Sequence, residues 1–342
     1  MLPFELFLHV LDYALEATKT PRRLLKRCSL INPTWRAAAQ SRLFSRYSRL
    51  TTVEGAQAWL ECECSEEAVK LQVELKEPDA DDEILAKRAV ELEGLYVELL
   101  CRAERLQLLE LHLSKVVPTS VLSLVSLSHL KHLKLTADEW HHEIGFVEGA
   151  EPPVFRLDSL VVDHFVFPPL LEFLLPALSN LTSLSVGLDE CDEDDHVDAV
   201  LAMLRTCRDT LMKLVLTVIE YPVCCDFLAS TLSSLRTLQS LEYYGNLCEC
   251  CCDSLILSLP SAVRSLFFHA EPFDTVSAML SETILDEEKL KSADGTPLLP
   301  ALERVEIPIK SKKLLSKREL DRAKAKRVLV RGFKARRAVN SH

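Results

Sequence analysis

Six cysteines are the residues of this sequence most capable of holding a metal ion. They are Cys224, Cys225, Cys248, Cys250, Cys251 and Cys252. A zinc site usually needs two separated pairs of ligands, with two to four residues between partners, so that four thiolates can close a tetrahedron. The C-x-C-C-C order of the second group does not give this spacing, because neighbouring residues of a strand point to opposite sides. The pattern favours small buried cysteines in a turn, with a metal site as the alternative.

Two other clusters contain residue types that can coordinate a metal ion. Residues 140–143 read Trp-His-His-Glu, but the second histidine of a zinc-protease helix would have to stand where the chain has Phe146. The acidic run 189–195 lacks the glycine and the closing glutamate of a calcium-binding loop. We interpret the first cluster as a surface loop. We interpret the acidic run as the cap of a helix that begins near His196, because carboxylates stabilise the positive N-terminal end of a helix. The alternative is an acidic loop that faces a partner.

Patterns for enzyme catalysis or phosphate binding are missing from the sequence. There is no G-x-S-x-G elbow, no P-loop and no G-x-G-x-x-G, and the nearest glycines to such a pattern, Gly145 and Gly149, are four residues apart. We therefore expect that the chain is not an enzyme and that it carries no cofactor.

Composition and charge indicate a packed globular protein of 342 residues, since 48% are apolar and the mean hydropathy is +0.09. The net charge of −11 is unevenly distributed. Residues 310–342 hold 13 Lys and Arg against two acidic residues, a charge of +11, and the remaining chain has 27 basic and 49 acidic residues, a charge of −22. So acidic a body repels nucleic acid.

The sequence also indicates a compartment. The 12 cysteines follow no regular disulfide spacing, the N-terminus has no secretory pattern, and no apolar run approaches the roughly 18 to 20 residues of a membrane span. We expect a reducing compartment, the cytosol or the nucleus.

The first 47 residues predict three short helices with more apolar surface than they can bury among themselves. Pro3 fits a first helical turn, Pro21 ends the helical run, and Asn32-Pro33 opens a later helix. The apolar positions of the first helix recur at helical spacing; they are Leu6, Phe7, Val10, Leu11 and Ala14. This surplus needs a neighbour, either the rest of the chain or another protein.

The same segment resembles an F-box. The matching residues are Leu2-Pro3, Glu5-Leu6, Val10-Leu11, Leu30-Ile31, Trp35-Arg36 and Leu43-Phe44. The match differs in Asn32-Pro33, which replaces a cysteine-basic pair, and in a longer link over residues 16–23. In that family the motif docks on the Skp-type adaptor of a cullin–RING ubiquitin ligase. The resemblance implies adaptor contacts by Leu2, Pro3, Leu6, Val10, Leu11, Leu30, Trp35, Leu43 and Phe44.

Beyond a linker after Tyr47 and a helix that Thr52 caps, the chain repeats the pattern L-x-x-L-x-L. The eight copies begin at Leu106, Leu130, Leu157, Leu181, Leu211, Leu238, Val263 and Leu302. Leu71-Val73-Leu75 fits a ninth, earlier strand. Each copy predicts a short strand with two inward residues at period two and one more that packs where the strand begins.

Helical segments are predicted between the strands, at 84–106, 118–127, 168–178, 197–207, 223–235 and 276–285. A strand and a helix every 24 to 30 residues, with one longer interval of 39, form a unit that cannot close its own core. Stacked units give a parallel sheet lined outside by helices. The array resembles leucine-rich repeats, although only Asn246 matches the Asn or Cys that the family places after each strand.

The basic C-terminal segment predicts an amphipathic helix over residues 317–338. Such a helix can bind calmodulin, an anionic membrane or nucleic acid, or act in nuclear import; otherwise it is a solvated helix beside the acidic body.

We therefore expect an α/β chain with an F-box-like domain at 1–47, an irregular leucine-rich-repeat solenoid at 48–309 and a basic tail at 310–342. The arrangement is similar to that of fungal F-box proteins. It implies a substrate receptor of an SCF-type ubiquitin ligase that binds the Skp-type adaptor and an unidentified protein target. The alternatives are a scaffold with a decayed F-box and an adaptor that acts through the basic tail.

Overall fold

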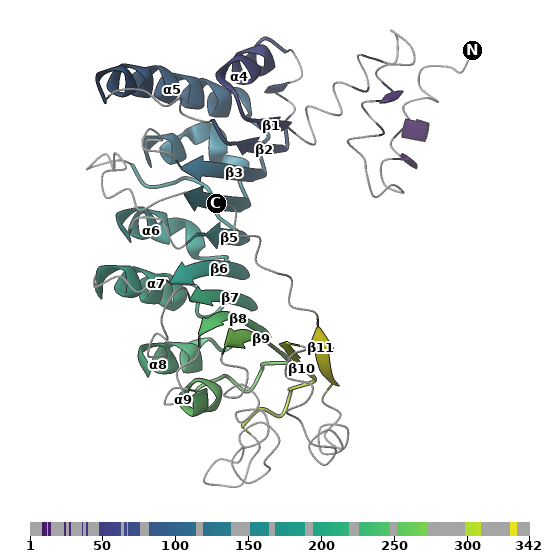
Figure 1. The fold of residues 1–342 in the computed structure, drawn as a ribbon, viewed down its shortest axis with the longest axis vertical. Coiled ribbons are helices and arrows are strands. Elements are labelled where there is room, and N and C mark those ends of the chain that lie inside the picture. The colour runs from purple at the N-terminus through teal and green to yellow at the C-terminus, as the bar shows by residue number, and fades with distance from the viewer. Residues whose placement is uncertain are drawn as a thin grey trace. The chain divides into compact units, whose positions relative to one another are not determined.

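The protein has an α/β fold built from parallel strands and helices (Figure 1). The computed structural model describes residues 9–11, 13–14, 24, 27–28, 36, 39, 48–62, 65–66, 68–75, 82–113, 119–137, 151–163, 168–188, 194–218, 226–246, 252–271, 298–308 and 329–333. The chain divides into two compact units, residues 1–156 and residues 157–342.

The first unit contains four parallel strands among its described residues, each paired with the next along the chain. Its elements are β1 (Ser48–Leu50), α4 (Val53–Leu60), β2 (Lys70–Val73), α5 (Asp82–Arg102), β3 (Leu108–Leu113), the 3-10 helices η2 (Thr119–Ser123) and η3 (Val125–His129), and β4 (His132–Ala137). As predicted, Thr52 is the N-cap of α4, and its hydroxyl accepts a hydrogen bond of 3.0 Å from the Gly55 amide.

The second unit contains seven strands among its described residues, again parallel and in chain order. Its elements are β5 (Ser159–Val162), α6 (Pro168–Leu174), η4 (Leu175–Leu178), β6 (Ser183–Leu188), α7 (Asp194–Thr206), β7 (Lys213–Val218), α8 (Asp226–Ser234), β8 (Ser240–Asn246), α9 (Cys252–Leu257), β9 (Ser265–Glu271), β10 (Arg304–Pro308) and β11 (Leu329–Phe333). Helices α6 to α9 stand in one row beside the strands (Figure 1).

The repeat pattern is confirmed at all eight predicted strands, β3 to β10, each of which begins two residues after the first apolar position. The first and second apolar residues of every copy are buried, most of them completely. The predicted earlier strand is confirmed as β2. The third apolar position is also buried wherever its side chain is described. The core of each unit is thus a ladder of aliphatic side chains between the strands and the helices.

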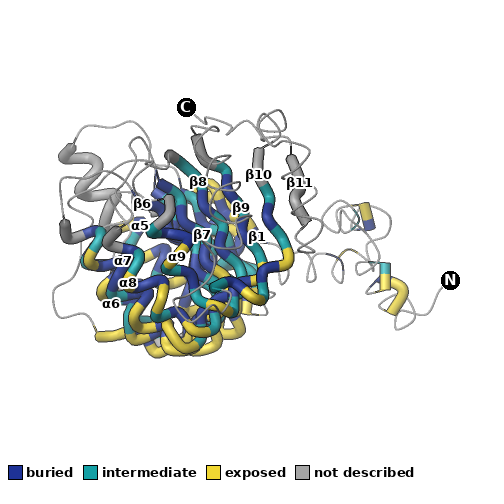
Figure 2. The backbone as a smooth tube through the Cα atoms, turned by 90° about the horizontal axis from the view of Figure 1, so that it is seen from below, coloured by how far each residue is buried: buried dark blue, intermediate teal, exposed yellow. Residues whose placement is uncertain are grey.

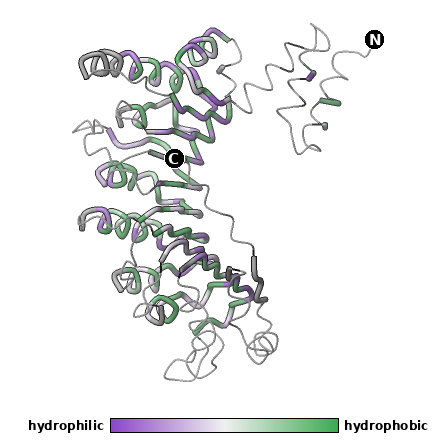
Figure 3. The backbone as a smooth tube through the Cα atoms, in the orientation of Figure 1, coloured by the Kyte–Doolittle hydropathy of each residue, from purple (hydrophilic) through white to green (hydrophobic). Residues whose placement is uncertain are grey.

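Burial alternates along the strands, so each strand has one side toward the core and one side away from it (Figure 2). In β7, for example, Leu214, Leu216 and Val218 are buried, whereas Val215 and Thr217 between them are half-buried. Apolar and polar residues also alternate along the helices (Figure 3). The side of the strands away from the helices is called the open face below.

Backbone hydrogen bonds join neighbouring repeats where the strands begin. In several repeats one carbonyl accepts two successive amides of the next repeat: the Thr182 carbonyl accepts from Met212 and Lys213, and the Met212 carbonyl accepts from Gln239 and Ser240. The hydroxyls of Thr210 and Thr237 add a second connection, donating to the carbonyls of Leu181 at 2.8 Å and Leu211 at 3.0 Å. The backbone where the strands begin thus links neighbouring repeats.

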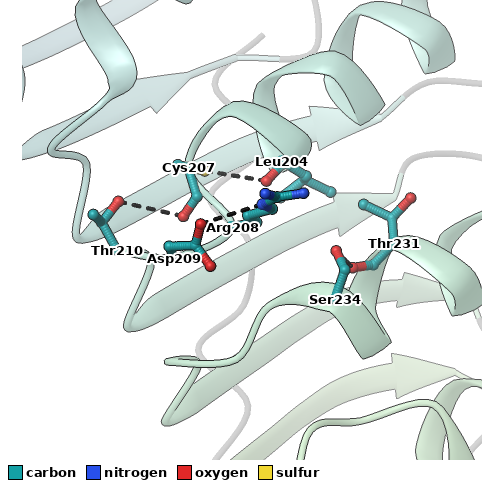
Figure 4. Close-up of polar contacts among 7 residues, drawn as sticks. All are labelled: Leu204, Cys207, Arg208, Asp209, Thr210, Thr231 and Ser234. Atoms are coloured by element: carbon teal, nitrogen blue, oxygen red, sulfur yellow. Dashed lines mark hydrogen bonds and ion pairs between the residues drawn. The ribbon is translucent and has the colours of Figure 1, made fainter.

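The end of α7 shows how a helix is closed before the next strand (Figure 4). The Cys207 thiol donates to the carbonyls of Met203 at 3.1 Å and Leu204 at 3.6 Å, and burial raises the pKa of this thiol to about 12. The Thr210 hydroxyl also donates to the Cys207 carbonyl at 3.3 Å. A buried neutral thiol therefore closes this helix end, in agreement with a structural role for cysteine here.

Several predicted elements differ in the structure. Helix α5 ends at Arg102, because Leu106 belongs to the next repeat, and the predicted helix 118–127 is two 3-10 helices. Residues 48–50, taken as linker, form β1. The predicted helix 276–285 lies outside the described residues.

The prediction of a C-terminal helix is wrong for residues 329–333, which form β11, in parallel register with β10. The physical reason is local: the apolar run Val328 to Val330 has strand propensity, and β10 would otherwise leave the amides and carbonyls of one edge without a neighbouring strand. The rest of the basic segment lies outside the described residues.

The N-terminal segment is described at few positions, all with helical backbone. Leu11 is buried, with 2% of its surface exposed, whereas its neighbour Val10 is 52% exposed. The other predicted adaptor contacts, Leu2, Pro3, Leu6, Leu30, Trp35, Leu43 and Phe44, lie outside the described residues. The three-helix domain and the boundaries at 47/48 and 309/310 therefore stay predictions.

Candidate functional site

Aromatic and charged side chains gather on the open face of β7 to β10 in the second unit. The strands are in register, so their open-face residues form rows across the sheet. The rows are Lys213–Ser240–Ser265–Arg304, then Val215–Glu242–Phe267–Glu306, then Thr217–Tyr244–His269. This set of residues is called the ring face.

Two rings of the ring face lie flat against each other. The centroids of Tyr244 and His269 are 3.9 Å apart, and the ring planes differ by 7°. The Tyr244 hydroxyl donates to Glu242 Oε2 at 3.3 Å. The stacked pair is therefore fixed both by ring contact and by a hydrogen bond along β8.

Each carboxylate of the ring face is paired with a cation. Glu242 Oε1 is 2.8 Å from Lys213 Nζ, and Glu306 Oε1 accepts a hydrogen bond of 2.8 Å from Arg304 Nε and another from Arg304 Nη2. The Arg304 guanidinium also lies over the Phe267 ring, 5.1 Å from its centroid. The carboxylates are the less exposed partners, since 18% of the Glu242 side chain and 14% of the Glu306 side chain are exposed, against 47% for Lys213 and 40% for Arg304.

The protonation of the stacked rings reflects this environment. Burial raises the pKa of Tyr244, and the charge of Glu242 and its hydrogen bond act in the same direction. Burial lowers the pKa of His269, while the charges of Glu242 and Glu306 partly oppose the shift. Both carboxylates are thus close enough to act on the imidazole, and both rings are favoured in their neutral forms.

The strand that carries Tyr244 ends in a backbone conformation that only glycine adopts easily. Gly245 has φ of 123°, and a Cβ at this position would lie 1.9 Å from the Val218 carbonyl oxygen. This close approach of β8 to β7 places Tyr244 beside the end of β7. Asn246, the one residue that matches the predicted polar position, follows directly as the last residue of β8.

The open face of β1 to β4 in the first unit has a different composition and is called the polar face. Arg49 pairs with Glu74 at 2.6 Å and Lys70 with Glu110 at 2.9 Å, while His112 Nδ1 lies 3.2 Å from Thr136 Oγ1. A shallow hollow of about 40 Å³ lies here. That volume is far below the roughly 300 Å³ at which small-molecule pockets begin. The hollow therefore does not indicate a ligand or cofactor site.

The clusters predicted from sequence fall largely outside the described residues. Cys252 is the first residue of α9, whereas the other five clustered cysteines and residues 140–143 lie outside. The acidic run does continue into a helix, because α7 begins at Asp194. Within the described part of the chain no three His, Cys, Asp or Glu residues are grouped to hold a metal. Nor is any helix there long and apolar enough to cross a membrane.

Sequence reasoning predicted that the strand and loop residues of the repeat array present a target, but it did not single out the ring face. The signal was present in the variable positions of the repeat, where the pattern L-x-x-L-x-L leaves every second strand residue open. In β8 and β9 these positions hold Glu242, Tyr244, Phe267 and His269. Their meaning depends on the register between strands, which the sequence of one strand does not contain.

Comparison with known proteins leaves the family undetermined, since the sequence matches no protein-family model and no curated protein. The resemblance to F-box and leucine-rich-repeat proteins therefore rests on the residues of this chain alone.

Proposed function

We propose that this chain is the substrate-recognition subunit of an SCF-type cullin–RING ubiquitin ligase. Residues 1–47 bind the Skp-type adaptor as an F-box, and an irregular leucine-rich-repeat solenoid presents the ring face to a target protein. The ligase chemistry belongs to other subunits, and the complex works in the cytosol or the nucleus.

The observation that carries the proposal is the ring face itself. Each repeat uses its apolar residues to close the core, so the open-face residues are not needed there and can define a binding surface. Tyrosine and arginine are enriched among residues that dominate binding energy at protein interfaces, and Tyr244 and Arg304 both stand on this face, beside Phe267. The Arg304 and Tyr244 side chains are held by neighbours before any partner arrives, which lowers the entropy cost of binding.

A second observation supports docking through the N-terminal segment. Val10 and Leu11 are adjacent residues of one helical stretch, yet Leu11 is buried and Val10 is exposed. This stretch thus carries one buried and one exposed apolar side chain, and we interpret the exposed one as available to a second protein.

Adaptor capture tests the proposal. The intact chain should bind a purified Skp-type adaptor, and Leu6→Asp combined with Trp35→Ala should abolish binding, because a charge and a cavity then replace apolar contacts. Tyr244→Ala combined with Phe267→Ala serves as the control, since it leaves residues 1–47 unchanged and should not affect adaptor binding. If the intact chain fails to bind, or if the N-terminal double variant binds equally well, the proposal is wrong.

A further inference from the structure

One arginine of the ring face is already bound by an aromatic ring and a carboxylate of the same face. Arg304 lies over Phe267 from the neighbouring strand β9 and donates two hydrogen bonds to the same oxygen of Glu306. Planar guanidinium groups combine stacking on a ring with directed hydrogen bonds, which an ammonium group does less well. The ring face therefore already holds a guanidinium group by ring stacking and by hydrogen bonds to a carboxylate.

A second combination of rings and carboxylates lies beside the first. The stacked pair of Tyr244 and His269 stands in the row next to the one that holds Glu242 on β8 and Glu306 on β10, and both carboxylates act electrostatically on His269. Neighbouring strands are about 4.8 Å apart, so the backbones of these two glutamates stand about 10 Å from each other. A group placed against an outer ring face of the stacked pair would lie beside the row that holds both glutamates.

These features favour a cation over an anion at this position. Aromatic faces attract cations, and the two glutamates would repel an anion. Lys213 and Arg304 neutralise the glutamates in part, but both belong to the preceding row and both are the more exposed partners. At longer range, residues 1–309 carry a charge of −22, which attracts basic segments.

We propose that the ring face binds an arginine side chain of an extended basic segment of the target protein, against the stacked pair of Tyr244 and His269 and beside the row of Glu242 and Glu306. The inference deepens the proposed function, because it names the class of target that the receptor selects. The bound arginine would contact the stacked rings in the way that Arg304 contacts the Phe267 ring.

A binding measurement with synthetic peptides tests the inference on the full-length chain. The probe is a fluorescein-labelled Ser/Gly peptide of twelve residues with three arginines, and the matched peptide carries citrulline, which keeps the shape of arginine without its charge. Fluorescence anisotropy should show the arginine peptide binding about tenfold more tightly than the citrulline peptide. Tyr244→Ala combined with Glu306→Gln should remove this preference.

The polar face provides the matched control. Glu110→Gln combined with His112→Ala removes a carboxylate and a ring from the open face of the first unit, and the affinity should change by less than about twofold. Circular dichroism and urea unfolding confirm that both variants are folded. The inference is overturned if citrulline binds as well as arginine, if a glutamate peptide binds more tightly, or if both double variants bind the arginine peptide like the parent chain.

The chain's own basic segment is the competing occupant. Replacing Lys334, Arg336 and Arg337 by alanine in the full-length chain should leave the affinity for the arginine peptide unchanged. Peptide binding that appears only in this triple variant would mean that the face is occupied from within the chain, and would overturn the inference. Because adaptor capture depends on residues 1–47, it separates failure of the inference from failure of the proposed function.

Discussion

The ring face and the polar face are built by the same repeat and yet carry different chemistry. In both units the strands are parallel and in register, and the apolar positions of the repeat are buried. Both faces also hold ion pairs between neighbouring strands, Lys70 with Glu110 in one and Lys213 with Glu242 in the other. The ring face adds Tyr244, Phe267 and His269. The comparison shows that the repeat fixes the fold through one set of positions and leaves the other set free to define a binding surface.

The largest expected effect on stability comes from the buried leucines that both units share. Leu109→Ala in the first unit and Leu241→Ala in the second each remove a fully buried side chain at the second residue of a strand. Each should lower the free energy of unfolding by about 2 to 5 kcal/mol, because the lost transfer energy is joined by the cavity left behind. Urea unfolding measures both. A cost below about 1 kcal/mol for either variant would show that the two cores are not equivalent.

A smaller effect separates the two faces. Arg304→Ala removes a guanidinium that stacks on Phe267 and satisfies the little-exposed Glu306, whereas Arg49→Ala removes one member of a more exposed pair with Glu74. We expect losses of about 1.5 kcal/mol and about 0.5 kcal/mol respectively, since exposed ion pairs contribute little. Equal losses in urea unfolding would contradict the distinction between the faces.

Acidification should lower the free energy of unfolding through His269 of the ring face. Burial places the pKa of His269 below that of the unfolded chain, so the unfolded state takes up the proton more readily. The stabilising contribution of neutral His269 is fully present above about pH 6.5, the ordinary pKa of histidine in the unfolded chain. It is lost as the pH falls toward the lowered pKa of His269 in the folded state. The groups facing His269 are Tyr244 and Glu242 on β8 and Glu306 on β10.

His269→Phe keeps a ring against Tyr244 and removes the titrating group. Comparing the urea stability of parent and variant at pH ~7.5 and ~5 isolates the contribution of this histidine from other titrating residues. The parent should lose more stability than the variant on acidification. The same loss in both proteins would show that His269 does not titrate as its burial implies.

A further effect concerns the hydroxyls that join repeats in the second unit. Thr210→Val removes the hydrogen bond to the Leu181 carbonyl and should cost about 1 kcal/mol. The equivalent positions of the first unit hold Arg105 and His129, so this link has no threonine counterpart there. The control is Thr206→Val, whose exposed hydroxyl bonds only within its own helix, to the Ala202 carbonyl. A larger loss for the control would contradict a role of the hydroxyl between repeats.

The strands were predictable from sequence because apolar residues at fixed spacing determine which positions are buried. Leu214, Leu216 and their equivalents predict the positions of β3 to β10, and Thr52 predicts the start of α4. These are local signals, and burial of the repeated leucines reinforces each of them in the stacked array.

The remaining features depend on partners that a local pattern does not contain. Residues 329–333 belong to a basic segment with helical periodicity, and only the edge of β10 makes them a strand. The ring face similarly requires the register between β8, β9 and β10, which brings together Tyr244 and His269 from copies 25 residues apart in sequence. The candidate site was thus predicted as a surface but not as a set of residues.

Affinity capture of targets tests the central claim most directly, using the full-length chain with Leu6→Asp so that captured proteins are retained rather than passed to the ligase. Three forms are compared by quantitative mass spectrometry: the unchanged faces, the ring-face variant Tyr244→Ala with Phe267→Ala, and the polar-face variant Glu110→Gln with His112→Ala. We predict that the ring-face variant loses a set of proteins that the polar-face variant keeps. Identical sets from both variants would contradict the assignment of target binding to the ring face.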